Sequence, residues 1–372
     1  MIANRDFVLP DSAKEFRTIW LSPNDDAVVQ VIDQRLLPHK LKLLDLSNWP
    51  DGERAIIDMA VRGAPLIGAT AAWSLYLAAR AGGIDEVRTA ASRLLESRPT
   101  AVNLRWAVER VIAVAEATAD GDGLVETLKN EATAICDEDV DISLGIGRSG
   151  LSLIRDIAKR KNGPVNILTH CNAGALATIN WGTATAPVYL AHQQGISVHV
   201  WVDETRPRNQ GSQLTAWELN RNGVPHTLVV DNAGGHLMQR GMVDIVITGT
   251  DRTTRNGDVA NKIGTYLKAL AAHDNDVPFY VALPSTTIDW SIDDGVRDIP
   301  IEERDPREVS HIVGEVGGRT VTVNTVADGT AVSNYAFDVT PARLVTGLIT
   351  ERGICNASEH GLAHLFPDLG KR

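Results

Sequence analysis

VNILTHCNAGALAT, residues 165–178, is the stretch of sequence from which the fold can be predicted. Its apolar start from Val165 to Leu168 is typical of a short buried strand, and polar residues around Gly174 then break the pattern before small residues open a helix. In an open α/β sheet, ligands bind at the carboxyl ends of the strands, because the turn there faces a crevice and the next helix points its N–H groups into it. We therefore predict a site at this turn, with Cys171 as a residue able to do chemistry.

The same layout of strand, polar loop and helix recurs along the rest of the chain. Strands are expected at 196–202, 227–230, 243–248 and 279–283, and helices at 210–220, 258–272 and 340–353. Strands that alternate with helices predict a doubly wound, mostly parallel, Rossmann-like α/β sheet.

The N-terminal residues predict a smaller domain made of a β-hairpin or short sheet plus helices. Two β-rich runs at 17–21 and 27–33 flank a turn, and a helix that starts near Gly52 ends at Arg62-Gly63. Ala64-Pro65 then opens a helix whose residues 66–79 are nearly all small or apolar, so we expect it to be buried. We expect two domains, 1–145 and 146–372, with the second carrying the catalytic sheet.

Composition limits the possible functions. The chain has 372 residues, 44% hydrophobic and 22% charged, as in a soluble globular protein, and its net charge of −11 argues against binding to a nucleic-acid backbone. The three cysteines form no C-x-x-C pair, and neither a secretory signal nor an apolar stretch long enough to span a bilayer is visible. We expect a cytoplasmic protein that associates with neither nucleic acid nor membrane.

Polar residues gather where the expected strands end. If the sheet is parallel, one edge carries Cys171, Asp203, Glu204, Arg206, Asp231 and Asp251, with Gln210 and Lys262 just inside the following helices. A thiol, carboxylates and cations together suit acid–base catalysis on a small phosphorylated molecule. The alternatives are a buried cysteine that only packs and carboxylates that only cap helices.

Two arginines precede helix starts. Arg62 lies beside the start of the buried helix, where backbone N–H groups and a guanidinium can hold an anion, although a surface arginine between helices is an equal alternative. Arg98 comes just before a helix that Thr100 can cap, and taken alone it is typical of a solvated loop arginine. The chain contains no dinucleotide-binding, ATP-binding, zinc or hydrolase motif, so we expect neither a cofactor nor a metal.

Nine motifs in order carry a resemblance to a known family. They are VRGAP (61–65), RPTAVNL (98–104), THCNAG (169–174), ETRP (204–207), QGSQLTAWEL (210–219), GTDR (249–252), NGDVANKIGTY (256–266), IPIEERDP (299–306) and AFDVTP (336–341). The chain resembles the methylthioribose-1-phosphate isomerases. Their superfamily also holds the alpha, beta and delta regulatory subunits of the guanine-nucleotide exchange complex of eukaryotic translation initiation.

The resemblance implies an aldose–ketose isomerase of methionine salvage, forming a homodimer through the sheet domain. It implies Cys171 and Asp251 as the catalytic pair, with Asp251 as the proton donor. The residues that it implies for holding the sugar phosphate are Arg62, Gly63, Ala64, Arg98, Gln210, Asn261 and Lys262. The alternatives are an isomerase of 5-deoxyribose 1-phosphate or ribose 1,5-bisphosphate, and a regulatory subunit that binds a phosphorylated ligand without turnover.

A mechanism follows as a hypothesis. Asp251, shielded from water, would have a raised pKa and donate a proton to the ring oxygen of the sugar. Cys171, as a thiolate favoured by the N-terminus of a helix, would take the proton from C2. Direct hydride transfer from C2 to C1 is the competing path.

Overall fold

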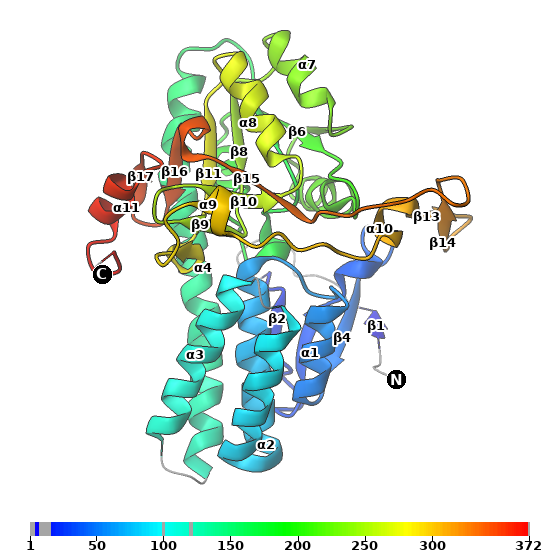
Figure 1. Cartoon of the computed structure of the whole chain (residues 1–372), viewed down its shortest axis with the longest axis vertical. Coiled ribbons are helices and arrows are strands. Elements are labelled where there is room, and N and C mark those ends of the chain that lie inside the picture. Colours follow the sequence, from blue (N-terminus) through cyan, green and yellow to red (C-terminus); the bar gives the residue numbers. More distant parts are fainter. Residues whose placement is uncertain (1–3, 7–15, 99–100, 119–121, 371–372) are drawn as a thin grey trace.

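The computed structural model describes residues 4–6, 16–98, 101–118 and 122–370. In its N-terminal part, a four-stranded antiparallel sheet in the order β1-β4-β3-β2 packs against helices (Figure 1). Its strands are β1 (Asn4–Asp6), β2 (Ile19–Leu21), β3 (Val29–Ile32) and β4 (Lys42–Leu46). The helices are α1 (Trp49–Ile57), α2 (Ala64–Ser97), α3 (Val102–Ala117) and α4 (Asp122–Ala158). The predicted hairpin is confirmed as the antiparallel pair β2–β3.

Helix α2 starts where the sequence predicts it. Pro65 lies in its first turn, where a missing N–H costs nothing, and residues 66–79 are all buried. The helix continues to Ser97 through a kink at Gly82 and Gly83. Arg98 follows its last turn, while Thr100, the predicted cap of the next helix, lies outside the described residues.

Helix α4 runs through both parts of the molecule (Figure 1). Its first half, including Leu128 and Ile135, belongs to the same hydrophobic core as α2 and α3. Its second half, including Ile146 and Ile154, packs in the core of the large sheet. The domain boundary that we predicted between residues 145 and 146 therefore falls inside one continuous helix, and it stays a prediction.

The C-terminal part is the Rossmann-like sheet. Seven strands lie in the order β17-β16-β11-β8-β5-β6-β7, and all neighbouring pairs are parallel except β16–β17 at one edge. The strands are β5 (Val165–Thr169), β6 (Val198–Asp203), β7 (His226–Val229), β8 (Ile245–Thr248), β11 (Phe279–Ala282), β16 (Gly347–Thr350) and β17 (Gly353–Cys355). The helices of this part include α5 (Ala186–Gln193), α6 (Ala216–Arg221), α7 (Ala233–Gln239), α8 (Thr265–Asp274) and α11 (Glu359–Leu365). The predicted fold class, a mostly parallel doubly wound sheet beside a smaller sheet-and-helix part, is confirmed.

The helix predicted over 258–272 is wrong in its first half. Residues Val259–Lys262 form strand β10, which pairs with β9 (Arg252–Thr254), and α8 begins only at Thr265. The turn between the two strands contains Asn256-Gly257, a dipeptide that favours tight hairpins, and Gly257 has a φ of 91°. Asn261 and Lys262 therefore lie on a strand, not in the first turn of a helix. Strands β12 (Ile288–Asp289) and β15 (Phe337–Thr340) complete this second sheet, in the order β12-β9-β10-β15.

The helix predicted over 340–353 is also wrong. A short 3₁₀ turn at Ala342–Leu344 is followed by strand β16, which is completely buried and pairs with β11. A short apolar run fits a buried strand or a buried helix equally well, so periodicity alone could not distinguish them. Gly353, with a φ of 131°, begins the return strand β17 rather than ending a helix.

Between β12 and β15 in the sequence lie α9 (Gly295–Asp298), α10 (Arg307–Ser310) and a hairpin formed by β13 (His311–Val316) and β14 (Arg319–Asn324). The hairpin projects from the body of the molecule (Figure 1). None of the helices in the described part of the chain combines the length and the apolar character needed to cross a bilayer.

Candidate active site

The loop after β5 holds Cys171 in an unusual backbone conformation. Its φ is 66°, in the left-handed region that residues other than glycine rarely adopt. The Cys171 N–H donates to Thr205 Oγ1 at 2.8 Å, and the Thr215 hydroxyl donates to the Cys171 carbonyl oxygen at 2.7 Å. The residue is only 5% exposed. Both backbone groups of Cys171 are therefore held by hydroxyls from the loop and turn that follow β6.

Arg62 is held at the start of α2 by the next residue of the same loop. Its Nη1 donates to the Asn172 carbonyl oxygen at 2.9 Å and to Asn172 Oδ1 at 2.6 Å. Asn172 Nδ2 in turn donates at 2.9 Å to Glu218, a buried carboxylate that also accepts from the N–H groups of Ala175 and Leu176. The charge of Glu218 is thus linked to the Arg62 guanidinium through one amide side chain.

Gly63 and Ala64 lie at the start of α2, which packs closely against the 3₁₀ turn Ala175–Ala177 that follows the Cys171 loop. Gly63 has a φ of 96°, and a Cβ added there would lie 2.4 Å from the carbonyl oxygen of Ala177. Only glycine fits this close approach. Ala64 is the first residue of α2, so the N–H groups of its first turn lie next to Arg62. This arrangement supports the predicted anion site.

The titratable side chains of Asp251 and Cys171 both interact electrostatically with Lys262. The pKa of the Asp251 carboxyl is raised by burial, and Lys262, Arg62 and Arg98 offset part of that rise. Burial also lowers the pKa of Lys262, while Cys171 and Asp251 act in the opposite direction. The Lys262 ammonium lies 4.8 Å from the centre of the Phe337 ring. Burial therefore favours the neutral forms of both Asp251 and Lys262.

The environment of Cys171 contradicts one part of the sequence-based hypothesis. Burial raises the pKa of its thiol, and the cations Arg62 and Lys262 offset this only in part. The element after the loop is a 3₁₀ turn, Ala175–Ala177, and not the N-terminus of an α-helix that would favour a thiolate. Without ligand, the thiol is the favoured form of Cys171.

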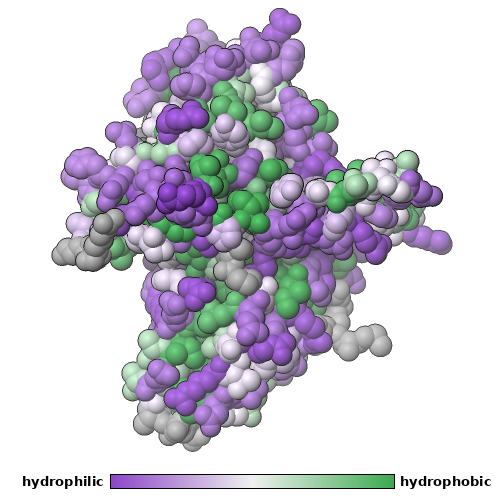
Figure 2. Space-filling model, in the orientation of Figure 1, coloured by the Kyte–Doolittle hydropathy of each residue, from purple (hydrophilic) through white to green (hydrophobic). Residues whose placement is uncertain are grey.

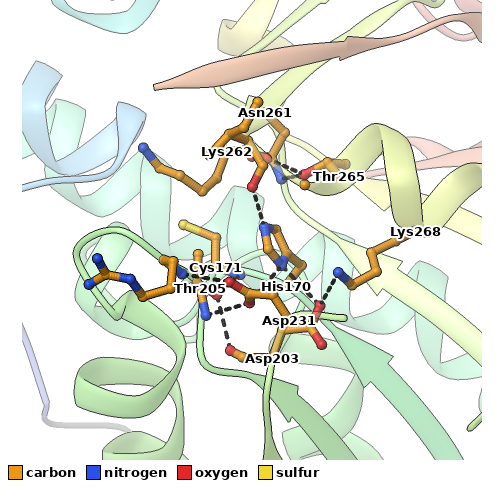
Figure 3. Close-up of polar contacts among 12 residues, drawn as sticks. His170, Cys171, Asp203, Thr205, Asp231, Asn261, Lys262, Thr265 and Lys268 are labelled. Atoms are coloured by element: carbon orange, nitrogen blue, oxygen red, sulfur yellow. Dashed lines mark hydrogen bonds and ion pairs between the residues drawn. The ribbon is translucent and has the colours of Figure 1, made fainter. Parts of the chain in front are cut away.

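The remaining predicted residues take different places. Gln210 lines a cavity of about 520 Å³ together with Arg62, and its Oε1 is buried without a hydrogen-bond partner among the described residues. The Asn261 side chain donates to Thr265 Oγ1 at 3.0 Å. Because side chains alternate along a strand, Asn261 and the neighbouring Lys262 lie on opposite faces of β10 (Figure 3). In this structure Asn261 therefore supports the start of α8.

Two carboxylates and a histidine that follow the strands form a supporting layer (Figure 3). His170 Nδ1 lies 2.9 Å from Asp203 Oδ2, and His170 Nε2 lies 2.8 Å from the Ile263 carbonyl oxygen. The Lys268 ammonium lies 3.2 Å from the same Asp203 oxygen. Asp231 accepts hydrogen bonds from the N–H groups of Thr205 and Arg206. His170, Asp203 and Asp231 are close enough to share a metal ion, and the Lys268 ammonium forms an ion pair with Asp203.

Sequence reasoning missed Thr205, Thr215 and Glu218 as parts of the site. Each reaches the Cys171 loop from 34 to 46 residues away in sequence. Thr205 lies in ETRP, and Thr215 and Glu218 lie in QGSQLTAWEL, both of which are among the nine motifs. The motifs therefore indicated that these stretches contribute to the site. Their spacing did not show which of their side chains would contact the Cys171 loop.

A Rossmann-like sheet whose strands lead to a buried thiol, a partly buried carboxyl and a cluster of cations defines an α/β protein with a candidate anion-binding site. The chain belongs to the Initiation factor 2 subunit family, whose model matches residues 60–357. The family predicted from the motifs is confirmed.

Two similar members of this family carry the same name. The chain is 59% identical to the methylthioribose-1-phosphate isomerase of Rhodospirillum centenum, covering 96% of this chain and 95% of that one. It is 57% identical to the enzyme of the same name from Methylorubrum extorquens, covering 95% and 97%.

Among solved structures, the 5-methylthioribose 1-phosphate isomerase of Pyrococcus horikoshii OT3 matches with a TM-score of 0.81 and 39% identity, covering 95% of this chain and 96% of that one. Subunit delta of the translation initiation factor eIF-2B from A. fulgidus matches with a TM-score of 0.78 and 37% identity, covering 95% and 99%.

Proposed function

We propose that this protein converts 5-methylthioribose 1-phosphate to 5-methylthioribulose 1-phosphate, as an aldose–ketose isomerase of methionine salvage. The observation that carries the proposal is the convergence of the buried Cys171 and the partly buried Asp251 with the cations Arg62, Arg98 and Lys262. The relatives named methylthioribose-1-phosphate isomerase, 59% and 57% identical over nearly the whole chain, support the substrate. A regulatory subunit needs the cations for binding, but it has no need of an acid with a raised pKa near a buried thiol.

The substrate dianion would bind where cations and N–H groups converge. Arg62, the start of α2 at Gly63 and Ala64, and Arg98 would hold the phosphate or the sugar hydroxyls. Gln210 would bind from the cavity that it shares with Arg62. Lys262 would pair with the dianion, which favours its charged form and so offsets the effect of burial. Asn261 would act by fixing the end of β10.

Asp251 is suited to open the sugar ring. Because the C1 oxygen carries the phosphate, no free hydroxyl at C1 can lose a proton to open the ring. The bond between C1 and the ring oxygen therefore breaks only if another group helps the ring oxygen to leave. Because burial raises its pKa, Asp251 keeps a proton to higher pH than a free carboxyl does and can donate it to the departing ring oxygen.

Two routes then lead to the ketose. In proton transfer, a thiolate at Cys171 removes the proton from C2 and gives an enediol that carries the phosphate on its C1 oxygen. C1 is then protonated while the C2 hydroxyl loses its proton. In hydride transfer, C2 passes its hydrogen with both bonding electrons to C1 while the C2 hydroxyl loses its proton. Solvent deuterium at C1 of the product would support proton transfer by Cys171, and its absence would support hydride transfer.

Turnover by the purified protein tests the proposed function. We expect 5-methylthioribose 1-phosphate to be converted with a higher kcat/KM than 5-deoxyribose 1-phosphate or ribose 1,5-bisphosphate. Faster conversion of either alternative would replace the proposed substrate, and tight binding without conversion would favour a regulatory subunit. We also propose that the protein is a homodimer located in the cytoplasm.

A further inference from the structure

The segment that contains the motif IPIEERDP crosses from the second sheet to the end of α2. Its backbone is fixed by two hydrogen bonds, from the Ala336 N–H to the Glu302 carbonyl oxygen and from the Arg304 N–H to the Asn334 carbonyl oxygen, each 2.9 Å. Ala336 directly precedes β15, the strand that pairs with β10 and thus with Lys262. The backbone therefore fixes Glu302 beside the strand that brings Lys262 to the site.

The Glu302 carboxylate lies between two guanidinium groups. Arg304 Nη1 donates to Oε1 at 2.7 Å, and Arg98 Nη2 donates to Oε2 at 3.1 Å. All three side chains are largely buried, with exposed fractions of 21% for Glu302, 12% for Arg98 and 16% for Arg304. Arg304 is also paired with Glu308 at 3.1 Å. Because Arg304 has this second partner, Glu302 can balance the charge of Arg98.

Arg98 is only half satisfied by this contact. Its Nε and Nη1 are buried and have no hydrogen-bond partner among the described residues. A buried donor without a partner is costly, so each of these two nitrogens favours an acceptor of its own. Holding the guanidinium by Nη2 leaves the other two donors for a ligand.

We propose that Glu302 is a positioning residue, which orients the Arg98 guanidinium so that Nε and Nη1 face the phosphorylated sugar. The proposal rests on the proposed function for the identity of the ligand. Glu302 acts through Arg98 and does not touch the substrate, which its own negative charge would repel. Glu302 belongs to a motif of the family that has no part in the mechanism described above.

The same carboxylate influences the catalytic acid. The charged and titratable groups around Asp251 are Lys262 on β10, Arg62 before α2, Arg98 after α2, Cys171 after β5, and Glu302. The three cations lower the pKa of Asp251, whereas Glu302 raises it. Removal of the Glu302 charge should therefore lower the pKa of Asp251 and shift the alkaline loss of activity to lower pH.

A double-mutant cycle tests the proposal. Glu302→Gln keeps the shape and loses the charge, Arg98→Met removes the guanidinium, and Glu303→Gln is the matched control on the exposed neighbour. For Glu302→Gln we expect KM to rise about tenfold with little change in kcat, as when a hydrogen bond to a charged group is loosened. In the Arg98→Met background the same change should alter KM by less than about twofold, because Glu302 then has nothing to position.

Two results would overturn the proposal. One is an effect of Glu302→Gln that is as large in the Arg98→Met background as in the wild-type background. The other is a lower melting temperature with KM and the pH profile unchanged. The cycle should also be run on the Kd of 5-methylthioribose 1-phosphate. A protein that binds the sugar phosphate without turnover would contradict the proposed function, and the coupling in Kd would still decide whether Glu302 acts through Arg98.

Discussion

Cys171 and Thr205 both adopt left-handed backbone conformations, with φ values of 66° and 65°. For a β-branched residue such as Thr205 this conformation is costly. The Thr205 hydroxyl accepts from the Cys171 N–H and donates to the Asp203 carbonyl oxygen at 3.0 Å, while Asp231 accepts from the Thr205 N–H at 2.7 Å. We infer that these hydrogen bonds offset the strain and fix where the thiol points.

We predict that Thr205→Val lowers kcat more than it changes KM. Valine has the shape of threonine without the hydroxyl, so the buried Cys171 N–H loses its acceptor at a cost of about 1–3 kcal/mol. Steady-state kinetics and urea unfolding measure the two effects. Thr133→Val, on the exposed side of α4, is the control and should change neither. Wild-type kcat in Thr205→Val would show that the hydroxyl does not position Cys171.

At the scale of elements, α4 carries a buried carboxylate at the junction of the two parts. Asp139 Oδ2 accepts from the Ile179 N–H at 2.8 Å, and burial raises the pKa of Asp139 to about 7. In the unfolded chain an aspartate titrates near a pKa of about 3.9. The folded state therefore binds more protons between about pH 4 and pH 7, so the contribution of Asp139 to stability falls as pH rises through this range.

We predict that Asp139→Asn stabilises the protein at pH 8 and has little effect at pH 4. An asparagine can still accept from the Ile179 N–H, but it does not have to bury a charge. The expected gain at pH 8 is on the order of a few kcal/mol in the free energy of unfolding, measured by urea titration. Asp141→Asn, at an exposed position on the same helix, should show no such dependence. An equal effect of Asp139→Asn at both pH values would contradict the assignment.

The sequence predicted some elements and missed others for physical reasons. Strands β5, β6, β8 and β11 could be predicted because buried parallel strands read as continuous apolar runs ending at polar loops. The positions of Cys171 and Asp251 after two of these strands followed from that pattern, whereas their pairing as catalytic residues rested on the resemblance. Strand β16 has the same composition as a buried helix, so only its partner β11 decides its structure. The contacts of Thr205 and Glu218 with the Cys171 loop depend on tertiary packing, which no local pattern encodes.

At the scale of the whole molecule, the projecting hairpin formed by β13 and β14 carries exposed apolar side chains. Residues Val316 and Val323 of this hairpin are 67% and 53% exposed, and Figure 2 shows pale and green side chains along this arm. A two-stranded hairpin is only marginally stable by itself in water. Exposed apolar surface of this kind is compatible with the homodimer that we propose.

We predict that light scattering gives a mass of twice one chain at micromolar concentration. The control is a dilution series, because a specific dimer dissociates with one equilibrium constant whereas an aggregate does not. A mass of one chain at every concentration would contradict the homodimer.

The most direct test of the central claim is turnover of 5-methylthioribose 1-phosphate by the wild-type protein beside Cys171→Ser and Asp251→Asn. Both substitutions keep the shape of the side chain, so binding of the sugar phosphate should persist. The account predicts conversion by the wild type and a loss of about a thousandfold or more in kcat in each variant, as expected when a group needed in the transition state is removed. Wild-type kcat in either variant would contradict the assignment of that residue, and a wild type that binds the sugar without converting it would contradict the isomerase itself.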